Sequence, residues 1–62
     1  MVKLLTDTFD ESRKFDDLEI QEEVNDLLTL NQIKDDDIIS ITYKTSKKSD
    51  WYYCKVKIWY KG

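Results

Sequence analysis

The side chains that could carry catalysis in this chain are limited in kind. There is no histidine and only one cysteine, Cys54, so neither a Ser-His-Asp nor a Cys-His arrangement can form. The 13 acidic residues offer many carboxylate pairs, but where acids are this dense such pairs arise from composition alone. Cys54 falls on the apolar parity of a strand pattern, which is typical of a buried, inert thiol. We therefore expect no catalytic residues and a protein that is not an enzyme.

Metal and cofactor sites are not expected either. The run Asp35-Asp36-Asp37 is the densest acidic segment, but calcium loops place their acids at alternate positions around a required glycine, and this run lacks that spacing. Without histidine, and with a single thiol, there is no ligand set for structural zinc. We interpret the run as a solvated connection and expect no metal and no cofactor.

The residues best suited to binding alternate along 51–61. One parity of this segment is mostly apolar and suits a core. It comprises Tyr52, Cys54, Val56, Ile58 and Tyr60. The other parity is aromatic at its ends and basic in its middle, and together with Lys44 it forms the candidate binding site. The candidate residues are Trp51, Tyr53, Lys55, Lys57, Trp59 and Lys44.

The same kind of pattern predicts the elements that position these residues. Alternation predicts strands over 2–7, 38–46 and 51–61, with a loop over 8–14 and a turn over 47–50. A helix is predicted to begin after Asp16, as the N-cap of a capping box with Glu19, with Phe15 as a hydrophobic staple. Its apolar face holds Ile20, Val24, Leu27 and Leu28, its other positions are acidic, and its end falls near Leu30 or Asn31.

The predicted fold class is α+β, a β-α-β-β domain. If Ser46 pairs with Trp51, the apolar parities of the last two strands coincide, because Tyr43 then meets Cys54 and Ile41 meets Val56. A right-handed crossover gives a three-stranded antiparallel or mixed sheet of order 1-3-2 with the helix on one face. The other face is predicted to carry the binding row with Lys44 and several neighbours. Those neighbours are Lys3, Leu5, Ile38, Ser40 and Thr42.

Length and charge limit the class of protein further. At 62 residues the chain is expected to form a single domain, 1–62, that buries only about 60% of its unfolded surface and gains from self-association. Residues 7–37 hold 12 acidic and three basic residues, whereas 38–62 hold one acidic and six basic residues. This division disfavours long nucleic acids as partners. No apolar run suits a membrane span or a secretion signal, so we expect a cytoplasmic protein without a membrane partner.

Three interpretations of the uncovered row remain open. The aromatic residues are too large a patch for a monomer to leave bare, so two sheets could pack face to face in a homo-oligomer. The row could instead hold a small anionic nucleotide, with Trp51, Tyr53 and Trp59 stacking on bases and Lys55 and Lys57 on phosphate. A host protein is the third candidate partner, with the acidic helix as a second contact surface.

Four segments resemble a family of short sporulation-associated proteins of bacilli that also occurs in phages of Gram-positive bacteria. They are Val2-Lys3-Leu4, residues 24–28, residues 39–46, and the closing Lys57-Ile58-Trp59-Tyr60-Lys61. The resemblance implies a small accessory protein and supplies no catalytic residues. With it, we predict a non-catalytic, homo-oligomeric phage-type inhibitor that neutralises a host immune or regulatory factor by occupancy. The alternatives are sequestration of a cyclic nucleotide signal at the oligomer interface, and a sporulation-associated structural or interaction protein.

Overall fold

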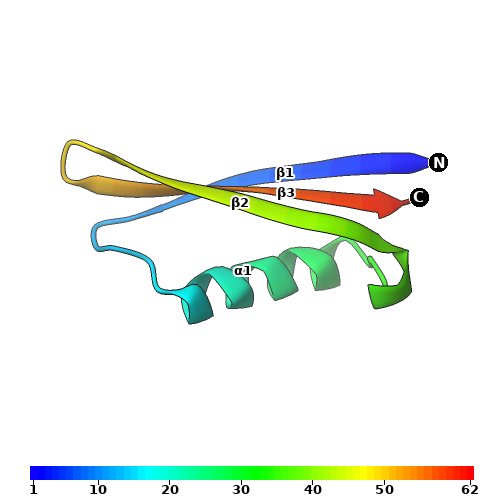
Figure 1. Cartoon of the computed structure of the whole chain (residues 1–62). Helices are drawn as coiled ribbons and strands as arrows, with labels where there is room; N and C mark the ends of the chain where they lie inside the picture. Colours follow the sequence, from blue (N-terminus) through cyan, green and yellow to red (C-terminus); the bar gives the residue numbers. More distant parts are fainter.

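The computed structural model describes all 62 residues as three strands and one helix. The elements are β1 (Val2–Glu11), α1 (Asp17–Leu30), the short 3₁₀ helix η1 (Asp35–Asp37), β2 (Ile38–Lys48) and β3 (Trp51–Lys61). The strands form one antiparallel sheet of order β1-β3-β2, and α1 lies against one face of it (Figure 1). The predicted β-α-β-β fold, with its sheet order and single helix, is confirmed. The one helix is too short and too polar to cross a membrane.

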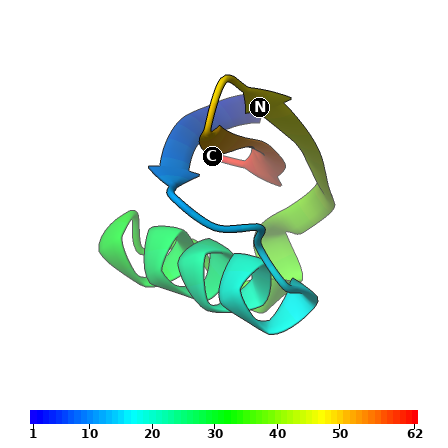
Figure 2. The ribbon, with the colours of Figure 1, turned by 90° about the vertical axis from the view of Figure 1, so that its left-hand side faces the viewer.

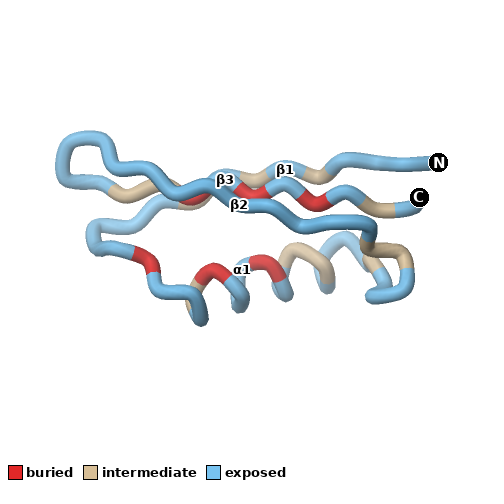
Figure 3. Tube along the Cα trace, viewed as in Figure 1, coloured by how far each residue is buried: buried red, intermediate tan, exposed pale blue.

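The core lies between α1 and the central strand β3. Cys54, Val56 and Ile58 are fully buried, because each side chain has a neighbouring strand on both sides and the helix in front of it. Ile20 and Val24 supply the helix side of this core, and Leu27 and Leu28 pack against it. Figure 3 shows the buried positions confined to the middle of β3 and to the side of α1 and its approach that faces the sheet. The predicted apolar parity of β3 and the predicted helix face are therefore both confirmed.

The helix begins and ends where its capping residues predict. Asp16 is the N-cap, and its carboxylate accepts a 2.8 Å hydrogen bond from the backbone N–H of Glu19. The carboxylate of Glu19 does not return to Asp16 as a capping box requires, since it accepts a 2.6 Å hydrogen bond from Arg13 instead. Phe15 is buried at the helix entry and meets Phe9 edge to face, with ring centroids 5.1 Å apart. Asn31 ends the helix as its C-cap.

Two predictions about β1 are wrong. The strand continues past Asp7 to Glu11, over residues that we expected in a loop, because Phe9 keeps the alternation of Leu5 and packs with it against the core. Leu5 lies opposite Ile58 of the buried row, so Leu5 and Lys3 belong to the helix side of the sheet. Val2 and Leu4 lie on the other face, where Lys3 and Leu5 were predicted.

The hairpin register differs from the predicted one by two residues. Lys48, not Ser46, pairs with Trp51, so that Tyr43 meets Val56 and Ile41 meets Ile58. A shift of two leaves every side chain on its predicted face, which is why the parities are right although the partners are wrong. β2 therefore extends to Lys48, and the connection shrinks to the turn Ser49-Asp50, in which Ser49 has φ 59°.

A bulge and a short helix change the start of β2. Ile38 pairs with Tyr60 and Ser40 with Trp59, which leaves Ile39 as an extra residue between them. The bulge turns Ile38 to the helix side, whereas we predicted it on the opposite face. Just before it, Asp35, Asp36 and Asp37 form the single turn η1, where no element was expected.

The helix does not reach the inner side of β2. The residues packed against the core come from α1, its flanking segments, β1 and β3, and none comes from β2. Ile39, Ile41 and Tyr43 remain 49%, 37% and 52% exposed. One helix is about 10 Å across, whereas three twisted strands with their side chains are wider, so one edge of the sheet stays open. Figure 2 shows the sheet arching over α1.

The two chain ends lie side by side at the end of the sheet away from the β2–β3 turn (Figure 1). Val2 pairs with Lys61, and the N–H of Gly62 donates a 2.8 Å hydrogen bond to the carbonyl oxygen of Met1. The first and last residues of the chain therefore close one end of the sheet.

The two-residue turn can be tested by replacing Ser49 with glycine. Because Ser49 has a positive φ, which a Cβ disfavours, Ser49→Gly is expected to raise the free energy of unfolding by about 0.5 to 1 kcal/mol in urea denaturation. Ser49→Ala is the matched control, since it retains the Cβ and should give no gain. Equal stability of the two variants would contradict the positive φ of Ser49 in this turn.

Candidate functional site

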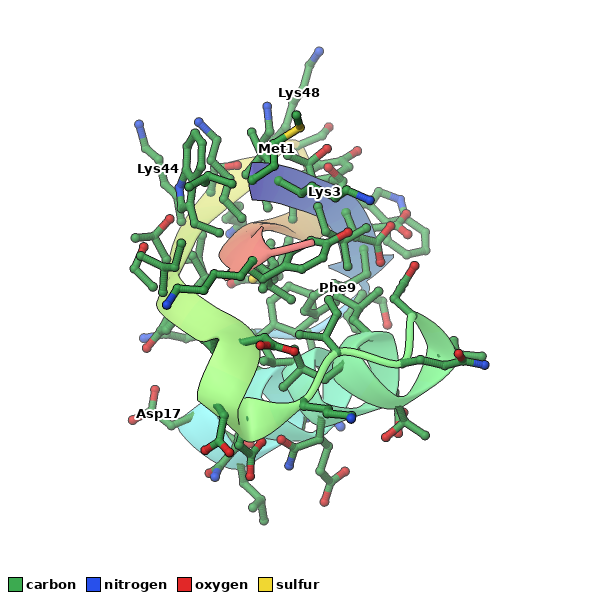
Figure 4. The ribbon with its side chains drawn as sticks, turned by 90° about the vertical axis from the view of Figure 1, so that its right-hand side faces the viewer. Met1, Lys3, Phe9, Asp17, Lys44 and Lys48 are labelled. Atoms are coloured by element: carbon green, nitrogen blue, oxygen red, sulfur yellow. The ribbon has the colours of Figure 1, made fainter.

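The face of the sheet turned away from α1, here called the outer face, gathers all six predicted binding residues. Trp51, Tyr53, Lys55, Lys57 and Trp59 project to it from β3, and Lys44 joins them from β2. In Figure 4, Lys44 and Lys48 extend on the side away from the helix, whereas Phe9 lies between sheet and helix. Lys61 of β3 also lies on this face, and the remaining members come from both edge strands. They are Ser40, Thr42, Ser46 and Lys48 from β2, and Val2, Leu4, Thr6, Thr8 and Asp10 from β1.

An open groove of about 820 Å³ lies on the outer face. Four of the predicted residues line it: Lys44, Tyr53, Lys55 and Lys57. Lys48 adds a further ammonium group, and the hydroxyl-bearing residues Thr8, Thr42 and Ser46 complete the polar lining. Tyr43 is the ninth lining residue, so the groove combines four cations and several hydrogen-bond donors with two phenol rings, those of Tyr53 and Tyr43.

No carboxylate neutralises the lysines of this groove. Lys44 lies directly opposite Lys55 across the β2–β3 pair, where Cβ atoms are typically about 5 Å apart and like charges destabilise the sheet. The single ion pair of the structure joins Arg13 to Glu19 at 2.6 Å, outside the sheet. Asp10 is the only acid on the outer face, and it lies opposite Tyr53 outside the groove lining. The groove is therefore a site of uncompensated positive charge.

The two tryptophans lie apart from each other and from the groove lining. Trp51 pairs with Lys48 at the turn end of the sheet, while Trp59 pairs with Leu4 and Ser40 near the chain ends. Eight residues of extended strand separate them, which corresponds to roughly 27 Å. One small ligand cannot contact both indoles. Tyr53 lines the groove itself, Trp51 lies opposite the groove residue Lys48, and Trp59 lies two residues beyond Lys57 on the same face.

The sequence did not reveal five of the groove residues. Thr8 fell in a segment predicted as a loop and Lys48 in a segment predicted as a turn. Thr42 and Ser46 were not singled out as binding residues, and Tyr43 was predicted on the apolar parity. The alternation of Leu5 and Phe9 is the signal that would have placed Thr8 on the outer face. For Lys48, the signal is the unbroken strand-forming pattern of β2 up to Ser49-Asp50, a pair suited to a tight turn.

Charge is segregated between the two sides of the molecule. The lysines stand on the outer face, while the carboxylates of α1 lie on the other side of the sheet. One acid there is neutralised: Arg13 bonds Glu19, and this hydrogen bond and charge raise the pKa of the Arg13 guanidinium. The arrangement can attract a negatively charged ligand to one side only, and it can hold that ligand with ammonium and hydroxyl donors.

The thiol of Cys54 is not part of this face. Cys54 is fully buried on the helix side of β3, and desolvation raises the pKa of its thiol. A raised pKa keeps the thiol protonated near neutral pH, and a protonated thiol is a poor nucleophile. No group of three or more His, Cys, Asp or Glu side chains is arranged to hold a metal ion.

Comparison of the chain with protein-family models, curated proteins and solved structures found no match. The resemblance to the sporulation-associated family therefore stays a prediction. The function is therefore inferred from the fold and from the geometry of the site.

Replacing Lys44 tests the like-charge contact directly. Lys44→Gln removes the repulsion with Lys55, so the free energy of unfolding should rise by about 0.2 to 1 kcal/mol, and the gain should shrink at high salt. Urea denaturation at two ionic strengths measures both effects. Lys48→Gln is the matched control on the same strand, because Lys48 faces Trp51 and should show a smaller gain. A gain that is independent of salt would count against repulsion as its cause.

The buried thiol makes the stability of the protein depend on alkaline pH. Because the pKa of Cys54 is higher in the folded than in the unfolded chain, its contribution is complete below the unfolded pKa of about 8.5 and declines as pH rises through the folded value. Urea denaturation between pH 7.5 and 9.5 should therefore show decreasing stability. Cys54→Ala should flatten this decrease, although the smaller side chain lowers stability at every pH. An unchanged slope would contradict the assignment.

Proposed function

We propose that this protein is a non-catalytic binding protein that holds a compact, phosphate-bearing nucleotide in the groove of its outer face and acts by occupancy. The observation that carries the proposal is the pair Lys44 and Lys55, set opposite each other without an acidic partner and flanked by Lys57 and Lys48 in one groove. A bound ligand is withheld from other receptors without any chemical step.

Electrostatics supports a phosphate as the charged group of the ligand. Opposed lysines cost stability in the free protein, and an anion placed between them converts that repulsion into two charge-assisted hydrogen bonds. Threonine and serine hydroxyls in the same groove can donate to further phosphate oxygens. A phosphate diester or a short phosphate chain offers enough oxygen atoms to use several of these donors together.

The aromatic residues support a base attached to that phosphate. Tyr53 is partly exposed within the groove lining, and Trp51 is 47% exposed two residues before it on the same face. Exposed rings next to a cationic groove are the arrangement on which nucleic-acid bases stack, at about 1 to 3 kcal/mol per base. A lone inorganic anion would leave these rings unused.

The extent of the positive charge supports a compact ligand over a long nucleic acid. The lysine groove is bounded by Trp51 at the turn end and by the apolar pair Leu4 and Trp59 at the other end. Beyond the sheet, the acidic surface of α1 repels a polyanion that continues past the groove.

The free thiol of Cys54 fits a reducing compartment, so we place the protein in the cytoplasm. Inhibition of a host protein, which was predicted from the uncovered aromatic and lysine row together with the family resemblance, stays the alternative, and the groove favours the nucleotide.

The proposal is tested by titrating the purified protein with cyclic dinucleotides, cyclic trinucleotides, ATP, inorganic phosphate and a single-stranded oligonucleotide. Tryptophan fluorescence reports binding, and the melting temperature reports stabilisation by the ligand. At least one small nucleotide should bind more tightly than phosphate and than the oligonucleotide at equal concentration. Binding should weaken as salt rises, because phosphate contacts release counterions.

The lysine variants make this test specific. Lys55→Gln should weaken nucleotide binding by about 10-fold or more, since a charged hydrogen bond contributes about 1.5 to 3 kcal/mol. Lys34→Gln is the matched control, because Lys34 is exposed outside the groove and should leave affinity unchanged. Absence of binding to every nucleotide, or equal losses in both variants, would overturn the proposal. Preference for the oligonucleotide would assign the face to single strands instead.

A further inference from the structure

The two edges of the sheet differ in how well they are protected. On the helix side of β1, Lys3 and Asp7 flank Leu5, and inward-pointing charges are a common device that prevents an edge strand from pairing with another chain. The matching positions of β2 are Ile41 and Tyr43, with Ile39 beside them, and all three remain exposed. The one inward-pointing charge of β2, Lys47, lies near the turn, so the stretch from Ile39 to Tyr43 is the part of the sheet edge at which charge does not oppose strand addition.

An apolar cleft accompanies this edge. It measures about 370 Å³, lies between α1 and β2, and is lined by Ile20, Val24, Ile41 and Tyr43 with two polar helix residues at its rim. The cleft exists because the helix does not reach the inner side of β2. A partner that covers it must bring apolar side chains and an extended backbone, so that the free N–H and C=O groups of β2 are also satisfied.

The charges along β2 specify the orientation of that partner. The acidic residues Asp35 and Asp36 stand exposed just before the strand, and the basic residues Lys44, Lys47 and Lys48 stand exposed at its other end. An antiparallel copy of the same segment places the acidic end of each chain beside the basic end of the other. A parallel copy would bring like charges together. The segment is thus complementary to itself only in the antiparallel, two-fold arrangement.

We propose that a second copy of this chain docks on β2, with the two β2 strands pairing antiparallel about Ile41 to form a continuous six-stranded sheet. Ile41 then meets Ile41 of the second copy, and Ile39 meets its Tyr43. Ile39, Ile41 and Tyr43 of the two copies form one apolar strip, which covers the cleft between α1 and β2 in each copy. The exposed acids Asp35 and Asp36 of η1 then lie at the end of the shared edge where the other copy carries Lys47, so opposite charges face each other at each end.

This interface differs from a face-to-face packing of two outer faces. In that packing, the uncompensated lysines of the two grooves would be buried against each other, which is costly for groups without acidic partners. Pairing through β2 leaves both outer faces open on the same side of the extended sheet. The dimer is therefore compatible with the proposed ligand groove but does not depend on it.

The test is the oligomeric state of the full chain and its variants in sedimentation velocity at micromolar concentration. The unchanged protein should sediment as a dimer, and Ile41→Lys should sediment as a monomer with unchanged circular dichroism, because Ile41 lies outside the buried core. Leu4→Lys is the matched control, since Leu4 is a similarly exposed aliphatic residue of the other edge strand and should leave the dimer intact. A monomeric unchanged protein would overturn the proposal, and so would dissociation by Leu4→Lys with Ile41→Lys still dimeric.

A charge-reversal pair tests the antiparallel orientation. Asp36→Lys and Lys47→Glu should each weaken association by about 10-fold, because the two-fold axis repeats every change twice. The double variant should recover most of that loss, since the opposite charges meet again in reversed positions. Recovery distinguishes the contact from a general effect of net charge. Additive weakening in the double variant would contradict the antiparallel pairing.

Discussion

The structure depends on a mismatch of width: one helix has to cover a sheet of three strands. The helix covers the centre, where Cys54, Val56 and Ile58 of β3 are fully buried, and it leans towards β1 through Leu5 and Phe9. As a consequence the inner side of β2 and the entire outer face lie beyond its reach. Only six of the 62 residues are buried, so the surfaces left open are large relative to the core that holds the chain together.

Most of the fold could be predicted from alternation and capping alone. Period-two patterns identified all three strands, and Asp16 and Asn31 marked the ends of the helix. The hairpin register could not be derived in the same way, because a shift by two residues preserves every face and changes only the partners. Resolving it requires knowing that Ser49 accepts a positive φ, a choice that the sequence signals weakly when no glycine is present. The strand predicted over 2–7 was too short, because the residues around Phe9 are polar and the alternation of Phe9 with Leu5 was not recognised.

The candidate site was predicted in its residue types and only partly in its geometry. Parity alone brought Lys44, Tyr53, Lys55 and Lys57 to one face. Parity says nothing about distance along a strand, so it did not separate the tryptophans, which stand at opposite ends of β3. It also did not reveal that Lys44 and Lys55 oppose each other, since that contact depends on the register. Alternation along one strand is enough to predict the face on which a side chain lies. Predicting which charged side chains lie opposite each other also requires the pairing register of neighbouring strands.

The meeting of the chain ends has a topological consequence. Because Met1 and Gly62 are hydrogen-bonded to each other, a short linker could join them and the chain could be reopened at Ser49-Asp50, between β2 and β3. In such a circular permutant β3 would come first and would run directly into its neighbour β1, which turns the longest-range pairing of the sheet into a local hairpin. The same cut makes the β2–β3 pairing the long-range one, so the permutant would reach the same architecture with the order of its two strand pairings reversed: β1 and β3 would pair locally, and β2 would join them from the far end of the chain.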